Sequence, residues 1–166
     1  MNYFDLKGLN VLVTGAAGHL GSAISISLAE YGAKVYLNGR DKKKLLNLKK
    51  KLNKAKLKSE IAHFDIENFQ EVKKFFIKIK KLDILVNNAY HGKTGTFENL
   101  NLDNYKESLN INVVSLANIV NKSLPLLKKS KNSSIINISS MYGSIIPDPS
   151  LYKNTRLNNP PHYGVT

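Results

Sequence analysis

The chain of 166 residues contains no cysteine. This absence excludes disulfide bonds and thiolate metal sites, and it favours a reducing compartment such as the cytoplasm. Long hydrophobic runs are also absent, since no stretch approaches the ~18 apolar residues that a membrane-spanning helix needs. The N-terminal region, with Asp5 and Lys7 before a short apolar run, does not resemble a signal peptide. We therefore expect a cytoplasmic protein with no membrane partner.

Acidic residues are scarce, with 12 Asp and Glu against 25 Lys and Arg, which gives a formal charge of +13. Such a charge invites a nucleic-acid hypothesis, because lysines neutralise phosphates. The cations, however, are almost all lysines in helix-patterned segments such as 42–44, 49–51 and 78–81, and the only arginines are Arg40 and Arg156. Solvated helix surfaces explain this pattern better, so no nucleic-acid partner is expected.

One glycine-rich turn, Thr14 to Gly21 (TGAAGHLG), follows the apolar run Leu9 to Val13 and opens onto a helix-patterned segment. Gly15 can take the positive φ of a sharp turn, Gly18 lets the backbone approach a pyrophosphate, and Gly21 lets helix and strand pack tightly. The N–H groups and the positive dipole end of the new helix then face the anion. The turn therefore predicts a phosphate-binding site.

Strand-like and helix-like segments alternate along the chain. Five apolar runs are the predicted strands: Leu9–Val13, Val35–Leu37, Ile61–Phe64, Ile84–Val86 and Ile135–Ile138. Apolar residues at helical spacing predict the helices between them: 20–31, a second from about Asp41 as N-cap, 69–79 and 103–127. Strands separated by helices imply right-handed crossovers and a parallel sheet, so the fold class is α/β. Ligands of such sheets bind at the carboxyl ends of the strands.

Five motifs in order closely resemble the short-chain dehydrogenase/reductase family of NAD(P)-dependent oxidoreductases. They are Thr14–Gly21, Asp65 after the third strand, Asn87-Asn88-Ala89, Asn112 in the long helix and Asn137-Ile-Ser-Ser140. The resemblance implies a Rossmann-type, doubly wound sheet of order 3-2-1-4-5, a single dinucleotide-binding domain over residues 1–166, and a homo-oligomer for the full-length enzyme. Family members are longer, and the lysine of their Tyr-x-x-x-Lys motif would fall one position beyond Thr166. We therefore expect a chain and a sheet that are incomplete at the C-terminus.

The residues at the end of the second strand favour NADP(H), with NAD as the alternative. Arg40 stands near where NAD-binding domains carry an acidic residue, and a guanidinium attracts a 2′-phosphate that an acidic group would repel. The alternative is an Arg40 that pairs with Asp41 or a helix end. The resemblance places Asp65 against the adenine ring, although a helix N-cap would look the same in sequence. The expected cofactor-binding residues are Gly15, Gly18, His19, Leu20, Gly21, Arg40, Asp65, Ile66, Asn88 and Ala89.

The resemblance implies hydride transfer between the nicotinamide and a carbonyl or alcohol substrate. A proton must move on the substrate oxygen, so a phenol acts as general acid or base. Ser140 matches the family's serine that holds this oxygen, with Ser139 as the alternative and strand-end hydrogen bonding as a rival role. Asn112 matches the asparagine that orients a relay water, although a buried asparagine that ties down backbone would have the same sequence.

Two tyrosines compete for the catalytic position. Tyr152 follows Ser140 at nearly the usual spacing, but Arg156 stands where a lysine is expected. Tyr163 precedes Gly-Val-Thr, which resembles the start of the family's Tyr-x-x-x-Lys helix, and we select it. Residues 141–162 then form an irregular loop on the substrate side, similar to one in bacterial relatives from surface-sugar or flagellin-modification pathways, and this suggests a sugar or polyol substrate.

The family usually has glycine after Asn88-Ala89, and this chain has Tyr90, which we expect to lie on the nicotinamide side or in the substrate pocket. The leading prediction is an NADP(H)-dependent oxidoreductase that acts on a small carbonyl or alcohol compound without a metal. The alternative is a catalytically inactive, cofactor-binding remnant of such an enzyme. A lysine encoded immediately after Thr166 would distinguish the first from the second.

Overall fold

The computed structural model describes residues 5–155 and 158–166, and within them five parallel strands form one sheet of order β3-β2-β1-β4-β5. The strands are β1 (Asn10–Val13), β2 (Lys34–Gly39), β3 (Ser59–His63), β4 (Ile84–Asn87) and β5 (Ser134–Asn137). Each predicted strand lies within two residues of the observed bounds. The predicted α/β class and strand order are confirmed.

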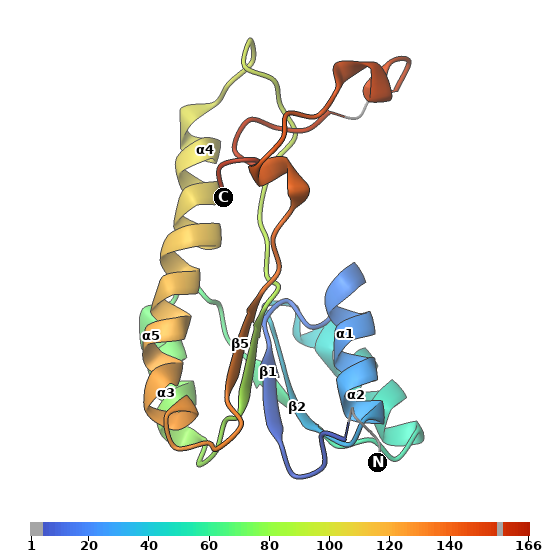
Figure 1. Cartoon of the computed structure of the whole chain (residues 1–166), viewed down its shortest axis with the longest axis vertical. Coiled ribbons are helices and arrows are strands. Elements are labelled where there is room, and N and C mark those ends of the chain that lie inside the picture. The colour runs from blue at the N-terminus through green and yellow to red at the C-terminus, as the bar shows by residue number, and fades with distance from the viewer. Residues whose placement is uncertain (1–4, 156–157) are drawn as a thin grey trace.

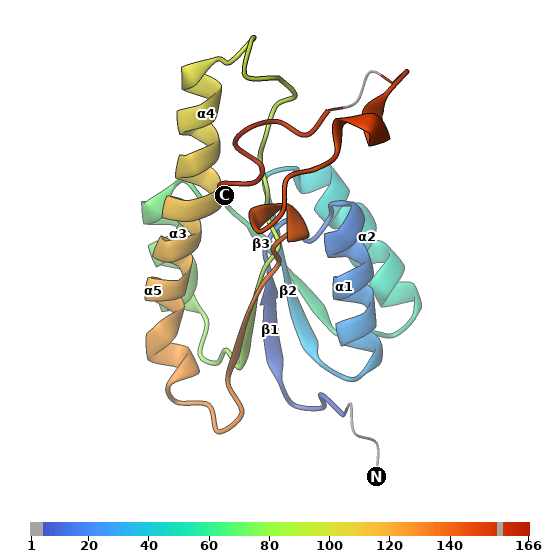
Figure 2. The same cartoon turned by 45° about the horizontal axis from the view of Figure 1, so that its top comes forward.

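Helices cover both faces of the sheet (Figure 1). They are α1 (His19–Glu30), α2 (Lys42–Lys54), α3 (Phe69–Lys78), α4 (Leu102–Leu109) and α5 (Leu116–Leu127). The helices α1 and α2 lie on one face, and α3, α4 and α5 lie on the other (Figures 1 and 2). Asp41 caps α2 as predicted, because its carboxylate accepts a hydrogen bond from the backbone N–H of Lys44 at 3.0 Å.

The strands have apolar side chains on both faces because each face packs against helices. On the α1–α2 face, Val11 and Val13 of β1 join a buried cluster with Leu45 of α2. On the opposite face, Leu12 and Leu85 join a second cluster, which α3 and α5 complete. The continuous apolar run of β4 is therefore the pattern of a parallel strand that is covered on both sides.

The long helix predicted over residues 103–127 contains a wider turn. Between α4 and α5 lies a π-helical segment, η1 (Asn110–Ser115). One such turn holds an extra residue, which a search for 3.6-residue periodicity does not detect. The carboxamide of Asn112 within η1 bonds to the backbone of His91, with its oxygen 2.9 Å from the His91 nitrogen. This contact ties the wider turn to the loop after β4.

The chain beyond β5 has little regular structure. Short 3₁₀ helices, η2 (Met141–Gly143) and η3 (Pro149–Tyr152), are followed by turns at residues 161–165. The strand β5 forms one edge of the described sheet, and all four of its residues are exposed. Over residues 5–155 and 158–166, no helix combines the length and the apolar composition needed to cross a membrane.

Asp83 connects β1, β4 and the turn before β5 at the amino-terminal edge of the sheet. Its buried carboxylate accepts hydrogen bonds from the backbone N–H of Asn10 at 2.8 Å and from the hydroxyl of Ser130 at 2.6 Å. The Lys81 ammonium lies 3.4 Å away. Burial raises the pKa of Asp83, but the bonds from Ser130, Asn10 and Lys81 outweigh it, so the pKa lies below its ordinary value.

We expect Asp83→Asn to lower the free energy of unfolding at pH 7 by about 2 kcal/mol, since hydrogen bonds to a charged group are lost. A carboxyl with a lowered folded pKa stabilises above its unfolded pKa of about 3.9, and this stabilisation is lost as the pH falls through the folded pKa. The difference between variant and wild type should therefore shrink at pH 3. Urea denaturation at both pH values tests this, with Asp103→Asn at an exposed site as control. An equal loss at both pH values would contradict the role of the charge.

Candidate functional site

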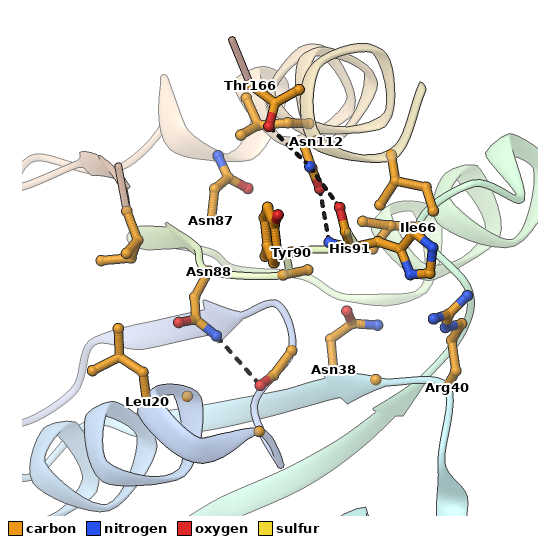
Figure 3. A pocket seen from close by; sticks show the side chains of 18 of the residues that line it. Leu20, Asn38, Arg40, Ile66, Asn87, Asn88, Tyr90, His91, Asn112 and Thr166 are labelled. Carbon is orange, nitrogen blue, oxygen red and sulfur yellow. Dashed lines mark hydrogen bonds between the residues drawn. The ribbon is translucent and has the colours of Figure 1, made fainter. Parts of the chain in front are cut away.

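A cavity of about 920 Å³ opens at the carboxyl ends of the strands, between the glycine turn and the segments after β4 and β5 (Figure 3). Every residue predicted for the site lines this cavity: Gly15, Gly18, His19, Leu20, Gly21, Arg40, Asp65, Ile66, Asn88, Ala89, Asn112, Ser140 and Tyr163. Ser139, the alternative to Ser140, lines it too. The sheet topology therefore brings together segments that lie far apart in the sequence.

The glycine turn leaves room for a ligand and for close packing at the same time. Gly15 has a φ of +63°, in the left-handed region that favours glycine. A Cβ at Gly21 would collide with the carbonyl oxygen of Gly15 and would lie 2.7 Å from the Asn88 amide nitrogen. Helix α1 begins after Gly18 without a side-chain cap, so the N–H groups of its first turn are available to an anion.

Thr14 joins the glycine turn to the end of β4. Its buried hydroxyl accepts hydrogen bonds from the backbone N–H groups of Asn88 at 2.9 Å and Ala89 at 3.0 Å. In return, the Asn88 amide donates to the carbonyl oxygens of Thr14 at 3.0 Å and Gly15 at 3.3 Å. The two cavity walls are thus held together by side-chain to backbone bonds.

Arg40, at the end of β2, faces Asp65 across the cavity mouth. One guanidinium nitrogen lies 3.8 Å from an Asp65 oxygen, and both side chains are partly exposed. The alternative pairing of Arg40 with Asp41 is wrong, because Asp41 caps α2 and lies 3.9 Å from the Lys44 ammonium. The alternative role of Asp65 as a helix N-cap is also wrong, because Asn68 caps α3.

Asn38 is a site residue that the sequence reasoning missed. Its amide nitrogen donates to the carbonyl oxygens of Ala62 and Phe64, both at 3.0 Å, and so links β2 to β3. Its side-chain oxygen is buried without a hydrogen-bond partner among the described residues, although Asn38 lines the cavity next to Arg40 (Figure 3). A buried acceptor without a partner suits a ligand that donates a hydroxyl hydrogen.

The predicted serine and asparagine both bind backbone. The Ser140 hydroxyl oxygen accepts from the Tyr142 backbone N–H at 3.2 Å, which leaves its own hydrogen for a ligand. The Asn112 amide donates to the His91 carbonyl oxygen at 2.8 Å and to the Thr166 hydroxyl at 3.1 Å (Figure 3). These are the contacts of the backbone-anchoring alternative, and a role in proton relay stays a prediction.

Tyr163 lies on the cavity wall within a group of aromatic rings. Its ring centroid is 5.4 Å from that of Tyr90, nearly perpendicular, and 6.3 Å from that of Tyr142. Burial, and then the neighbouring Tyr163, raise the pKa of Tyr90. Tyr152 lies on η3, outside the described cavity lining, and its hydrogen bond with Tyr142 raises its pKa. Arg156, which follows Tyr152 where a lysine was expected, lies outside the described residues.

Metal-ligating side chains do not gather at the cavity. Across residues 5–155 and 158–166, no group of three or more histidine, aspartate or glutamate side chains is arranged to hold a metal ion. The polar groups that line the cavity are glycine backbone, amides, hydroxyls, the Arg40 guanidinium, the Lys44 ammonium, two carboxylates (Asp41 and Asp65) and two imidazoles (His19 and His91).

Comparison with known proteins agrees with this geometry. The profile of the short chain dehydrogenase family matches residues 9–152. An uncharacterized oxidoreductase of Staphylococcus aureus (strain MW2) is 30% identical over 151 residues, which cover 87% of this chain and 64% of that protein. A 3-oxoacyl-[acyl-carrier-protein] reductase of Thermotoga maritima is 27% identical over 142 residues, which cover 83% of this chain and 58% of that protein.

Solved structures show the same architecture. The RhlG/NADP active-site complex of Pseudomonas aeruginosa superposes with a TM-score of 0.86 at 25% identity, covering 99% of this chain and 64% of that one. A short chain dehydrogenase of Burkholderia cenocepacia in complex with NADP gives a TM-score of 0.79 at 26% identity, covering 89% and 62%.

The sheet and its carboxyl-end cavity define a doubly wound α/β protein with a ligand site at the switch point between β1 and β4. The chain belongs to the short chain dehydrogenase family of oxidoreductases. It spans 64% of the length of the Staphylococcus aureus relative.

Proposed function

We propose that this chain carries the NADP(H) site and part of the catalytic site of an oxidoreductase that transfers hydride between the nicotinamide and a carbonyl or alcohol carbon. The observation that carries the proposal is the convergence of the glycine turn, Arg40, Ser140 and Tyr163 on one cavity. The family assignment and the NADP bound to two similar structures support it.

The cavity fits a dinucleotide in three places. The start of α1 after Gly18 has no side-chain cap, so the free N–H groups of its first turn suit a pyrophosphate. The orphaned oxygen of Asn38 suits a ribose hydroxyl. Arg40 suits the 2′-phosphate, because its contact with Asp65 at 3.8 Å is long and partly exposed and is therefore easily exchanged for a phosphate.

When bound, the nicotinamide supplies or accepts the hydride. Side chains of the protein then bind the substrate oxygen and transfer its proton. The Tyr163 phenol donates or accepts the proton, and the Ser140 hydroxyl, whose oxygen is already fixed by the Tyr142 N–H, donates a hydrogen bond to the substrate oxygen. Asn112 holds the π-helical turn against the loop after β4 and so fixes the wall of the cavity behind the reacting groups.

We assign a small polar carbonyl or alcohol compound, such as a sugar or polyol, as substrate. The cavity lining on the side of Tyr163 includes Tyr90, Ser140 and Gly143, and phenol and serine hydroxyls suit a hydroxylated ligand. Residues 1–166 act as one dinucleotide-binding unit in this proposal. For the full-length enzyme the proposal includes a homo-oligomer, as the family resemblance implies, and a cytoplasmic location, which the absence of cysteine favours.

We expect Arg40→Ala to weaken NADPH binding by about 1.5 to 3 kcal/mol, the contribution of a charge-assisted hydrogen bond, and to leave NADH binding nearly unchanged. Calorimetric titration of both nucleotides measures this. Lys43→Ala, an exposed lysine on α2 outside the cavity lining, controls for the general positive charge. Equal affinities of the wild type for NADPH and NADH would overturn the cofactor assignment. Selective NADPH binding by a full-length polypeptide without turnover would favour the inactive remnant.

A further inference from the structure

One buried side chain packs the last residues of the chain against α4 and the loop after β4. Among the side chains that the structure describes after Leu127, only that of His162 is buried, with 3% of its surface exposed. Leu151 is 68% exposed and Val165 is 60% exposed. The next residue in the chain is Tyr163, so the buried imidazole and the proposed catalytic phenol belong to neighbouring residues.

His162 is buried between α4 and the loop that joins β4 to α4 (residues 88–101). Its ring lies 6.2 Å from the ring of Tyr105 on α4 in an edge-to-face arrangement. Its Nε2 atom faces Gly92, where an added Cβ would lie 2.7 Å from Nε2 and would collide with the Tyr90 hydroxyl. Gly92 therefore lets the loop close over the imidazole.

The residues around Tyr163 are held by the buried His162 ring together with the bond from the Asn112 amide to the Thr166 hydroxyl at 3.1 Å. The carbonyl oxygen of His162 accepts the backbone N–H groups of Val165 at 3.2 Å and Thr166 at 3.1 Å, and the Tyr163 N–H donates to Pro160 at 2.9 Å. These bonds define one turn, residues 160–166, which we call the tyrosine turn. It belongs to no described helix or strand, so its own backbone bonds do not fix it against the sheet.

We propose that His162 is the positioning residue for Tyr163: its neutral, buried imidazole anchors the tyrosine turn beneath the loop after β4, and protonation of the imidazole releases that turn. The inference rests on the proposed function insofar as Tyr163 is the acid–base group. The attachment of the tyrosine turn by His162 can be measured without an activity assay.

The surroundings of His162 favour the neutral imidazole. Its Nε2 atom has no hydrogen-bond partner among the described residues. Tyr90 and Tyr105 present aromatic rings to it, and the imidazole of His91 lies close enough to interact electrostatically. Burial, and then His91, lower the pKa of His162 below its ordinary value. The nearby carboxylate, Glu107, lies 3.6 Å from His91 and so faces that ring.

The charge of Lys93 does not change the conclusion that the His162 imidazole is neutral. The Lys93 ammonium lies 3.4 Å from Glu107 and 2.9 Å from the Asn104 side chain, so it offsets the carboxylate. A histidine whose folded pKa lies below its unfolded value of about 6.5 takes up its proton more readily when unfolded. The anchor is therefore at full strength above about pH 6.5, and it weakens as the pH falls from there toward the folded pKa.

Hydrogen exchange of the tyrosine turn tests the anchor. In the wild type, exchange of a peptide covering residues 158–166, corrected for the intrinsic rate, should accelerate by about tenfold or more between pH 7.5 and pH 5. His162→Ala removes the ring and should give fast exchange at both values. His162→Phe fills the same space without a titrating nitrogen, so exchange should stay slow at both values. Leu151→Ala, an exposed apolar residue of the same segment, should behave as the wild type does.

Two outcomes overturn the proposal: His162→Ala exchanging as slowly as the wild type at pH 7.5, or His162→Phe keeping the wild-type pH dependence. The same samples separate this inference from the proposed function. Unchanged exchange in the variants together with selective NADPH binding refutes the anchor alone. The expected exchange pattern in a protein without NADPH selectivity supports the anchor and refutes the cofactor assignment.

Discussion

Replacement of Tyr163 by phenylalanine is expected to lower the turnover of carbonyl reduction in the full-length polypeptide by a factor of about 10² to 10⁴, the contribution of general acid catalysis. The change removes only the phenol oxygen. The ring contacts with Tyr90 and Tyr142 remain, so folding and NADPH affinity should change little. Steady-state NADPH oxidation with a panel of keto-sugars and simple diketones, together with NADPH titration, measures both quantities.

Tyr152→Phe is the matched control for this experiment. Tyr152 lies outside the described cavity lining and bonds to Tyr142, so its loss should leave most of the turnover intact. Sequence spacing from Ser140 alone favours Tyr152, whereas the cavity favours Tyr163. If Tyr152→Phe abolishes turnover and Tyr163→Phe does not, the assignment after Ser140 is wrong and the substrate side of the site must be redrawn.

The fold was predictable because its signals are local. Strand β4 is apolar at every core position since helices cover both faces, and the helices repeat apolar residues at the spacing of one buried stripe. The glycine turn was predictable for a similar reason: positive φ at Gly15 and contact between Gly21 and Gly15 concern residues only a few positions apart. Parallel strands then bring the ends of all these segments to one edge.

The details of the site depended on contacts between distant residues. Arg40 faces Asp65, which lies in the loop after β3, the strand next to β2. Proximity in the sequence offers Asp41 as the partner of Arg40 instead. The π-helical turn depends on the bonds of Asn112 to His91, 21 positions away. Asn38 has no sequence signal of its own, since an asparagine that links two strands and one that caps a turn look alike. Spacing along a chain does not report such partners.

The burial of His162 could not be predicted from the sequence either. The stretch after β5 has no hydrophobic periodicity, and a histidine in a proline-rich stretch is not a usual core residue. Its burial arises because α4 and the loop after β4 close over it, with Gly92 at the contact. Only the three-dimensional arrangement identifies it as the attachment point of the segment that carries Tyr163.

Thr14→Val is expected to produce a large loss of stability. Valine has nearly the shape of threonine but no hydroxyl, so the N–H groups of Asn88 and Ala89 lose their acceptor. An unsatisfied buried donor costs about 1 to 3 kcal/mol, and two partly buried donors should together lower the free energy of unfolding by about 2 to 4 kcal/mol. Urea denaturation followed by circular dichroism measures this loss.

Thr14→Ser separates the hydroxyl from the methyl group. Serine keeps the acceptor and loses one methyl, so it should cost only about 1 kcal/mol. NADPH affinity should follow the same order, with wild type close to Thr14→Ser and well above Thr14→Val, because Asn88 and Ala89 form the cavity wall that the hydroxyl holds in place. If valine is tolerated and serine is not, side-chain packing and not hydrogen bonding joins the glycine turn to β4. The geometry of the nucleotide site would then depend on the apolar contact at Thr14.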